Sequence, residues 1–367
     1  MNNFNQGLNP FEQTVYAMEQ QSNAEKKAFA MKDGNSYRVV VAEQEELLGR
    51  PLEQHELEMV RKIAGVEDYA WSRGEQGGLD TGFPFFNEAI EGGLPTAFIL
   101  FAAAPNVGKS AFLLQLMKQV AEKNENVYCE YMSLDDSSNV IFPRLIATDQ
   151  LITIGQAKNP EQYKDEPDVL EKRAQGVKNF YKMVNKFSLR DSGDGNTIEA
   201  IEERIKYLRM SLPEGTRIAI GLDSFYDVKT EKKVHKDDLH GFVAEEVKRL
   251  TTDYDVTIMG TAHLRKNGNK RPVTEDLKDG NRLEYEVELL CMLYNEVGIK
   301  EEAADVYWLG EDEDKKMPVV EIRFAKNKLS DFKGTRFYEM IPAYSHFMEA
   351  TDEGCKRYSS LIYGSRN

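Results

Sequence analysis

The feature that most constrains this chain is a continuous apolar run, residues 97–103 (AFILFAA), which leads directly into the loop sequence APNVGKS. A short apolar run bounded by turn-forming residues is typical of a buried strand. Residues 110–122 then carry apolar side chains at helical spacing. The fold must therefore place a buried strand, a tight glycine-containing loop and an amphipathic helix in immediate succession.

Residues 103–110 have the form A/G-x4-G-K-S/T, which between a strand and a helix is typical of a loop that binds nucleotide phosphates. Gly108 lets the backbone curl around a phosphate, and the first amides of the helix point at the anion. Lys109 is expected to reach the β- and γ-phosphates and Ser110 to bind Mg²⁺, so ATP and Mg²⁺ are the predicted ligands. The predicted phosphate cradle consists of Ala104, Pro105, Asn106, Val107, Gly108, Lys109, Ser110 and Ala111. The alternative is an ordinary strand-to-helix turn.

Strand and helix patterns alternate along the rest of the chain. Strands are expected at 127–134, 217–223, 256–262 and 286–294, with a closing pair at 318–326 and 334–340. Helices are expected at 110–122, 198–210 and 239–252. This alternation predicts an α/β fold with a mostly parallel sheet that is covered by helices on both faces.

Two acidic residues follow expected strands on the side of the phosphate loop. Asp223 closes the apolar run IAIGLD, a position suited to holding Mg²⁺. Asp135 follows the strand at 127–134 and is a candidate for polarising an attacking water. The alternative for Asp135 is a solvated strand end or a helix N-cap.

The segment before residue 77 has a different composition. Residues 1–35 are rich in Asn, Gln and Glu, whereas residues 43–64 predict two short helices broken near 49–51. This segment is either a helical appendage or an arm that packs on a neighbouring subunit. The first residues lack the apolar stretch of a signal peptide, and no apolar run approaches the roughly 18 residues of a membrane span. We therefore expect a cytoplasmic protein without membrane contact.

The net charge of this 367-residue chain is −15, which disfavours a protein that coats duplex DNA over a broad face. Its three cysteines are too far apart for a zinc ribbon and give no disulfide framework. A local exception to the acidic balance is the stretch 265–282, whose cations are Arg265, Lys266, Lys270, Arg271, Lys278 and Arg282. A basic loop of this kind suits a phosphodiester backbone, and a solvated hairpin is the alternative.

Four further segments give the chain a family resemblance. They are 81–87 (TGFPFFN) with 92–94 (GGL), 261–265 (TAHLR), 271–284 (RPVTEDLKDGNRLE) and 324–328 (FAKNK). Together with the phosphate loop, they resemble the ATPase domain of the replicative ring helicases, typified by DnaB and the phage primase-helicases. The resemblance covers residues 77–348 and implies a RecA-like core, with residues 1–76 as an N-terminal arm and 349–367 as a tail.

The resemblance also implies roles for individual residues. Asp135 would orient the attacking water, Asp223 would hold Mg²⁺ and His263 would sense the γ-phosphate. Lys326 and Lys328 would reach into the ATP site of a neighbouring subunit, and Arg323 or Arg336 could substitute for Lys328, which stands where the family has an arginine. The loop that would grip single-stranded DNA comprises Arg265, Lys266, Lys270, Arg271, Lys278, Asp279, Gly280 and Arg282.

The function implied is that of an ATP-dependent helicase or translocase on single-stranded DNA, with ATP hydrolysis at sites between the subunits of a hexameric ring. Two alternatives stay open from the sequence. A recombinase or annealing factor shares the same core but forms filaments, and a weakly hydrolysing clamp or loader would suit the aspartate at 135 and the lysine at 328. A primase, a loader or another replication protein is the expected partner of the N-terminal arm.

Overall fold

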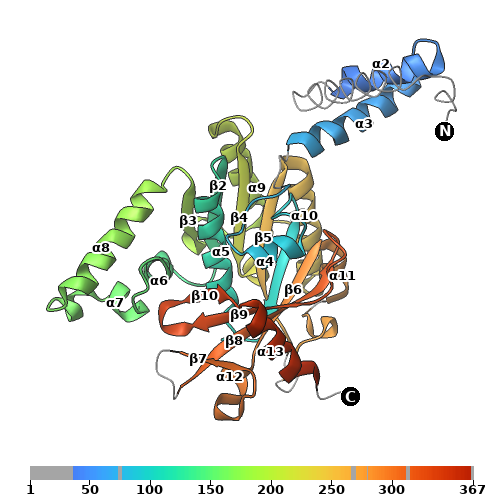
Figure 1. The fold of residues 1–367 in the computed structure, drawn as a ribbon. Helices are drawn as coiled ribbons and strands as arrows, with labels where there is room; N and C mark the ends of the chain where they lie inside the picture. Colours follow the sequence, from blue (N-terminus) through green and yellow to red (C-terminus); the bar gives the residue numbers. More distant parts are fainter. Residues whose placement is uncertain (1–35, 73–76, 266–269, 279, 311–314, 365–367) are drawn as a thin grey trace, which may run out of the picture. The chain divides into compact units, whose positions relative to one another are not determined.

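The computed structural model describes residues 36–72, 77–265, 270–278, 280–310 and 315–364 (Figure 1). The chain divides into two compact units, Met1–Gly77 and Gly78–Asn367. The segment 1–35 and two predicted DNA-binding residues, Lys266 and Asp279, lie outside the described residues. No helix within the described ranges is long and apolar enough to cross a membrane.

The first unit is a pair of helices, α2 (Ser36–Leu48) and α3 (Gln54–Ser72), which pack against each other. The break between them begins at Gly49, whose φ of +66° is a conformation that glycine adopts without strain. Arg50 then forms an ion pair of 2.8 Å with Glu56 at the start of the second helix. The predicted break at 49–51 is therefore confirmed, and both helices are longer than expected.

The second unit is built on one mixed sheet. Its parallel strands are β1 (Phe98–Ala103), β2 (Val127–Ser133), β3 (Phe187–Asp191), β4 (Arg217–Asp223), β5 (Val256–His263) and β6 (Leu289–Asn295). The antiparallel strands are β7 (Tyr307–Leu309), β8 (Lys316–Asn327), β9 (Thr335–Ile341) and β10 (His346–Glu349). The order across the sheet is β10-β9-β8-β6-β1-β5-β4-β2-β3, and β7 pairs with β8.

Successive side chains of a strand point to opposite faces of the sheet. Both faces of this sheet are apolar, and helices cover both of them. In β1, for example, Ile99 and Phe101 enter one core and Phe98 and Leu100 enter the other. Helices on the first face are α4 (Pro84–Ala89), α5 (Lys109–Lys123), α6 (Ser138–Gln150) and α8 (Pro167–Lys182). Helices on the second are α9 (Ile198–Ser211), α10 (Leu239–Tyr254) and α11 (Gly280–Glu286). The predicted α/β architecture is thus confirmed.

Four parts of the second unit differ from expectation. The strand expected at 286–294 begins only at Leu289, because α11 occupies the chain up to Glu286. Residues 138–182 form α6, α7 (Ile154–Lys158) and α8, which no pattern had indicated. A short α12 (Glu296–Lys300) follows β6, and residues 349–367 include α13 (Asp352–Tyr363), which packs Tyr358 against Phe337 of β9.

Candidate nucleotide site

The loop between β1 and α5 has the backbone geometry of an anion cradle. Asn106 has a φ of +63° and Gly108, the residue before α5, has a φ of +108°. A Cβ at position 108 would lie 3.1 Å from Phe347 Cζ and 3.3 Å from Met340 Sδ, so both backbone angle and space favour glycine there. Because α5 begins at Lys109, its first free amides face the same loop.

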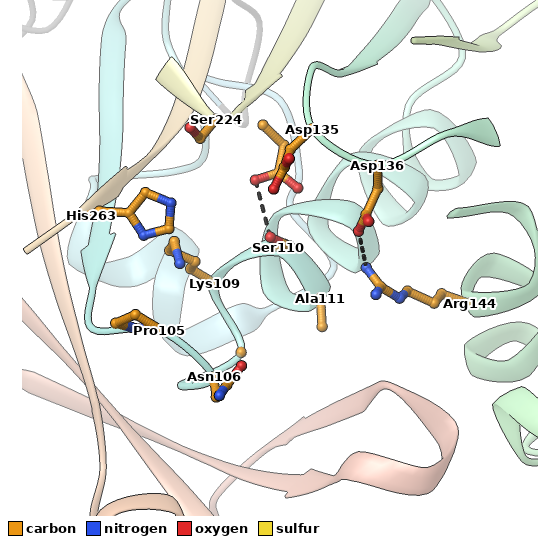
Figure 2. Close-up of a pocket in the computed structure, with 12 residues that line it drawn as sticks. Pro105, Asn106, Lys109, Ser110, Ala111, Asp135, Asp136, Arg144, Ser224 and His263 are labelled. Atoms are coloured by element: carbon orange, nitrogen blue, oxygen red, sulfur yellow. Dashed lines mark hydrogen bonds and ion pairs between the residues drawn. The ribbon is translucent and has the colours of Figure 1, made fainter. Parts of the chain in front are cut away.

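A cavity of about 370 Å³ lies over this loop (Figure 2). It is lined by Pro105, Asn106, Gly108, Lys109, Ser110, Ala111, Asp135, Asp136, Arg144, Asp223, Ser224 and His263. The parallel strands β1, β2, β4 and β5 all end at this edge of the sheet, which brings residues far apart in sequence together. Of the predicted cradle, Ala104 and Val107 do not line the cavity, and Val107 is buried in the core instead.

The carboxylate of Asp223 is fixed in place by three hydroxyl groups. Ser110 Oγ donates to Asp223 Oδ1 at 3.0 Å, Thr261 Oγ1 to the same oxygen at 2.5 Å, and Tyr131 Oη to Oδ2 at 2.6 Å. A serine hydroxyl beside a carboxylate is a donor set that suits Mg²⁺ bound to nucleotide phosphates. Sequence reasoning assigned no role to Tyr131 or to the Thr261 hydroxyl, because their contacts are made between strands.

Charges in the cavity influence one another. Burial lowers the pKa of the Lys109 ammonium, against the opposing attraction of the Asp223 and Asp135 carboxylates. Burial, and then the nearby Lys109 ammonium, lowers the pKa of His263 below its ordinary value of 6.5. The imidazole is therefore neutral at pH 7 and can both donate and accept a hydrogen bond.

The two acids after β2 differ in their surroundings. Asp135 is exposed and projects into the cavity, whereas Asp136 forms a 3.0 Å ion pair with Arg144 of α6 (Figure 2). Arg144 thus brings a guanidinium to the cavity wall, and sequence reasoning missed it. No sequence pattern indicated α6, so no signal placed Arg144 beside the phosphate loop.

Lys326 and Lys328 lie at the other end of the sheet. Asn327 pairs with Leu289 at the start of β6, whereas Ala103, where the phosphate loop begins, pairs with Leu293. The ammonium of Lys326 donates to the carbonyl of Glu284 and, at 3.0 Å, to that of Tyr285. Lys328 Nζ lies 5.6 Å from the centroid of the Tyr285 ring. Burial, and then the proximity of Lys328, lowers the pKa of Lys326 to about 8.

Two arginines of the predicted DNA-binding loop are engaged in ion pairs. Arg271 reaches Glu321 at 2.7 Å and Glu296 at 2.9 Å, and both carboxylates are buried. Arg282 reaches Glu245 at 2.6 Å and Asp238 at 3.5 Å. The predicted role of Arg271 in gripping DNA is therefore in competition with a structural one.

The other described cations of that loop are exposed. Arg265 is anchored through its backbone amide, which donates a hydrogen bond to the carbonyl of Asp276 at 2.7 Å. Lys270, five residues further along the chain, is also exposed. Lys278 Nζ lies 5.5 Å from the Tyr226 ring centroid, and its carbonyl accepts a 2.6 Å hydrogen bond from Tyr226 Oη. Gly280 begins α11. Tyr226 therefore holds the backbone of the loop at Lys278, while the side chain of Lys278 stays at the surface.

This fold and this cavity define a RecA-like P-loop domain. Residues 78–340 match the family described as the DnaB-like helicase C terminal domain, and the chain belongs to that family. The chain is 25% identical to the replicative DNA helicase DnaB of Geobacillus stearothermophilus over 75% of its own length and 57% of that protein. It is 21% identical to a probable replicative DNA helicase of Trieres chinensis over 71% and 55%. The chain thus spans little more than half the length of these curated relatives.

Solved structures agree on the fold. One solved ATPase domain superposes with a TM-score of 0.66 at 19% identity, covering 79% of this chain and 98% of that one. A DnaB-like replicative helicase, whose structure was described together with its interactions with primase, superposes with a TM-score of 0.65 at 19% identity, covering 92% and 78%.

Proposed function

We propose that this protein is an ATP- and Mg²⁺-dependent motor that moves along single-stranded DNA as a ring of identical subunits in DNA replication. The observation that carries the proposal is the convergence of Lys109, Ser110, Asp135, Asp223 and His263 on one cavity. That convergence lies within the residues that match the DnaB-like family.

Each of these side chains has a role that its position supports. Lys109 and the amides at the start of α5 bind the β- and γ-phosphates, and Ser110 and Asp223 hold the Mg²⁺. The bound ion would neutralise charge on the phosphates. Asp135 orients the attacking water, and the neutral imidazole of His263 reads whether a γ-phosphate is present.

The position of Lys326 on β8, and of Lys328 directly after that strand, supports the proposed ring. Lys326 and Lys328 lie at the end of the sheet opposite the phosphate loop, so they cannot reach the nucleotide of their own chain. In a closed head-to-tail assembly they would reach the nucleotide of the next subunit, where they would stabilise charge that develops during hydrolysis. A hexamer is the subunit number that the family resemblance suggests.

Contact with DNA is assigned mainly to Lys278, Arg265 and Lys270, which are exposed. Arg271 and Arg282 would support the loop through their carboxylate partners. A primase is proposed as a partner of the helical unit before Gly78, because one of the superposing helicases was described together with its interactions with primase.

A second candidate is a weakly hydrolysing, ATP-gated clamp or loader. Two observations favour it: the acid at the water-orienting position is the short Asp135, and the neighbour-facing cation is Lys328, which lacks the planar fork of an arginine. Both changes would slow hydrolysis without weakening nucleotide binding.

The test is steady-state ATP hydrolysis with and without single-stranded DNA, on protein whose oligomeric mass is measured in the same buffer. Strong stimulation in a closed ring of fixed mass supports the motor. ATP binding with negligible turnover supports the clamp, and filaments of variable length support a recombinase-like assembly.

A further inference from the structure

A second cavity, of about 560 Å³, lies outside the nucleotide site. Its walls come from the segment Val273–Glu275, from β8 at Arg323, from the β8–β9 connection with the start of β9, and from Tyr363 of α13. It therefore borders the segment that leads into Lys278.

Arg323 lines this cavity beside an irregularity in β8. Arg323 pairs with Met292 and Lys326 pairs with Leu290, and the register shifts between these pairs. Met292 and Leu290 belong to the same core, so Arg323 and Lys326 are placed on one face of the sheet although they are three residues apart. Without the bulge they would lie on opposite faces.

The guanidinium of Arg323 is incompletely bonded. Its Nη2 donates to Met292 Sδ at 3.4 Å, and sulfur is a weak acceptor. Its Nε is buried and has no hydrogen-bond partner among the residues that the structure describes. A buried donor without a partner is costly, so the packing around Arg323 leaves its guanidinium short of hydrogen-bond acceptors.

We propose that this cavity is a subsite for a phosphate group, held by Arg323 and Lys333. A guanidinium binds phosphate oxygens in a bidentate fashion and an ammonium adds a point charge. The Thr335 hydroxyl, on the strand next to Arg323, supplies a neutral donor. Against these two cations the lining holds one acid, Glu275, so its balance is +1 in a chain whose net charge is −15.

The phosphate belongs to the single-stranded DNA of the proposed function, on which this assignment rests. Glu275 is three residues from Lys278, so the cavity wall and that lysine are separated by at most roughly 10 Å of extended backbone. One DNA strand can therefore contact the exposed lysine with one phosphodiester and Arg323 with a nearby one. The source that must be distinguished from it is a free phosphate or pyrophosphate.

The experiment compares the wild-type chain with Arg323→Met and, separately, Lys333→Met. Methionine has a side chain of similar length without the donor to Met292 Sδ, and Lys333 is exposed, so its variant carries little risk to folding. The matched control is Arg190→Met, which removes a partly exposed arginine from β3 at the far edge of the sheet. Binding of labelled oligo(dT) is measured between about 50 and 200 mM salt, and the shift in melting temperature caused by sodium phosphate is measured in parallel.

We expect each cavity variant to weaken oligo(dT) binding about tenfold and to lower the salt slope by about 0.7, whereas Arg190→Met does neither. Loss of the phosphate-induced shift in Arg323→Met with unchanged DNA binding would assign the subsite to free phosphate. Unchanged DNA binding and an unchanged phosphate response would overturn the subsite while leaving the motor intact. A loss of ATP hydrolysis alone would assign Arg323 to a neighbour's nucleotide and also overturn it. A wild-type chain that binds no DNA would refute the proposed function, and the phosphate response alone would then decide the subsite.

Discussion

The two ends of the parallel sheet present their charged residues in different ways. At the carboxyl ends of β1, β4 and β5, one chain supplies a cation, a hydroxyl and a fixed carboxylate to one cavity. At the other end, Lys326 and Lys328 contact the backbone and the ring of the segment 284–285. The first end draws its phosphate-loop cation, hydroxyl and carboxylate from one chain, whereas the second offers cations whose proposed target lies in another copy.

The difference arises from strand direction. Parallel strands bring their loops to one edge, and the antiparallel β8 carries the chain back to the other edge. The residues of 324–328 alone do not show this separation, and only the family resemblance assigned Lys326 and Lys328 to the site of a neighbouring subunit.

The largest effect is expected from Lys109→Ala, which removes the phosphate-loop cation from the nucleotide cavity. Hydrolysis should fall at least about 100-fold, because the charge on the transferred phosphate loses its partner. Steady-state ATPase assays check this, with Lys123→Ala in the exposed last turn of the same helix as the control. Retained turnover in a folded variant would remove the phosphate-loop assignment.

Lys278→Ala tests whether the DNA-binding role can be separated from the nucleotide site. Affinity for single-stranded DNA should fall several-fold and its salt slope by about 0.7, with ATP binding unchanged. Titrations at several salt concentrations measure both, and Lys182→Ala at the exposed end of α8 is the control. An unchanged slope would contradict the role of the loop.

Asp135→Glu tests the role of the acid that projects into the nucleotide cavity. Glutamate extends the carboxylate by one methylene, and hydrolysis should be preserved or raised within about threefold if this group orients water. Asp135→Asn, which keeps the shape and loses the charge, should lose most activity in the same assay. A folded glutamate variant with no turnover would speak against the water-orienting role.

The smallest effect concerns the charge of Lys326. Because burial and Lys328 lower its pKa to about 8, the ammonium is charged below that pH and neutral above it. Any contribution of its charge to hydrolysis should therefore be present below pH 8 and decline as the pH rises. Lys326→Arg stays charged and should flatten that decline. Superimposable profiles of the two proteins from about pH 7 to 9.5 would contradict this.

Local patterns predicted the centre of the fold and much of the cavity. The strand, loop and helix at 97–122 are contiguous, so the apolar run and the glycine sufficed, and the ends of β4 and β5 placed Asp223 and His263 beside them. The partners of these groups were not predictable. Tyr131 and Thr261 fix Asp223 through contacts between strands, and a single sequence carries no signal for such a pairing.

The number of cations that the basic loop can offer to DNA was also not predictable from the sequence. Arg271 counted as an available cation in the sequence, yet Glu321, 50 residues away, pairs with it once β8 is in place. Charge counted along the chain therefore overestimated how many cations of the loop are available for DNA.

The central claim, that each nucleotide site is completed by a second copy, is tested most directly by mixing two inactive variants. Lys109→Ala chains keep Lys326 and Lys328, whereas Lys326→Ala/Lys328→Ala chains keep the phosphate loop. If the lysines act on a neighbour, an equal mixture that has exchanged subunits should recover about a quarter of the wild-type hydrolysis rate, since half of each contribution is intact at random interfaces. A mixture that assembles to the wild-type mass and stays as inactive as its components would contradict the account.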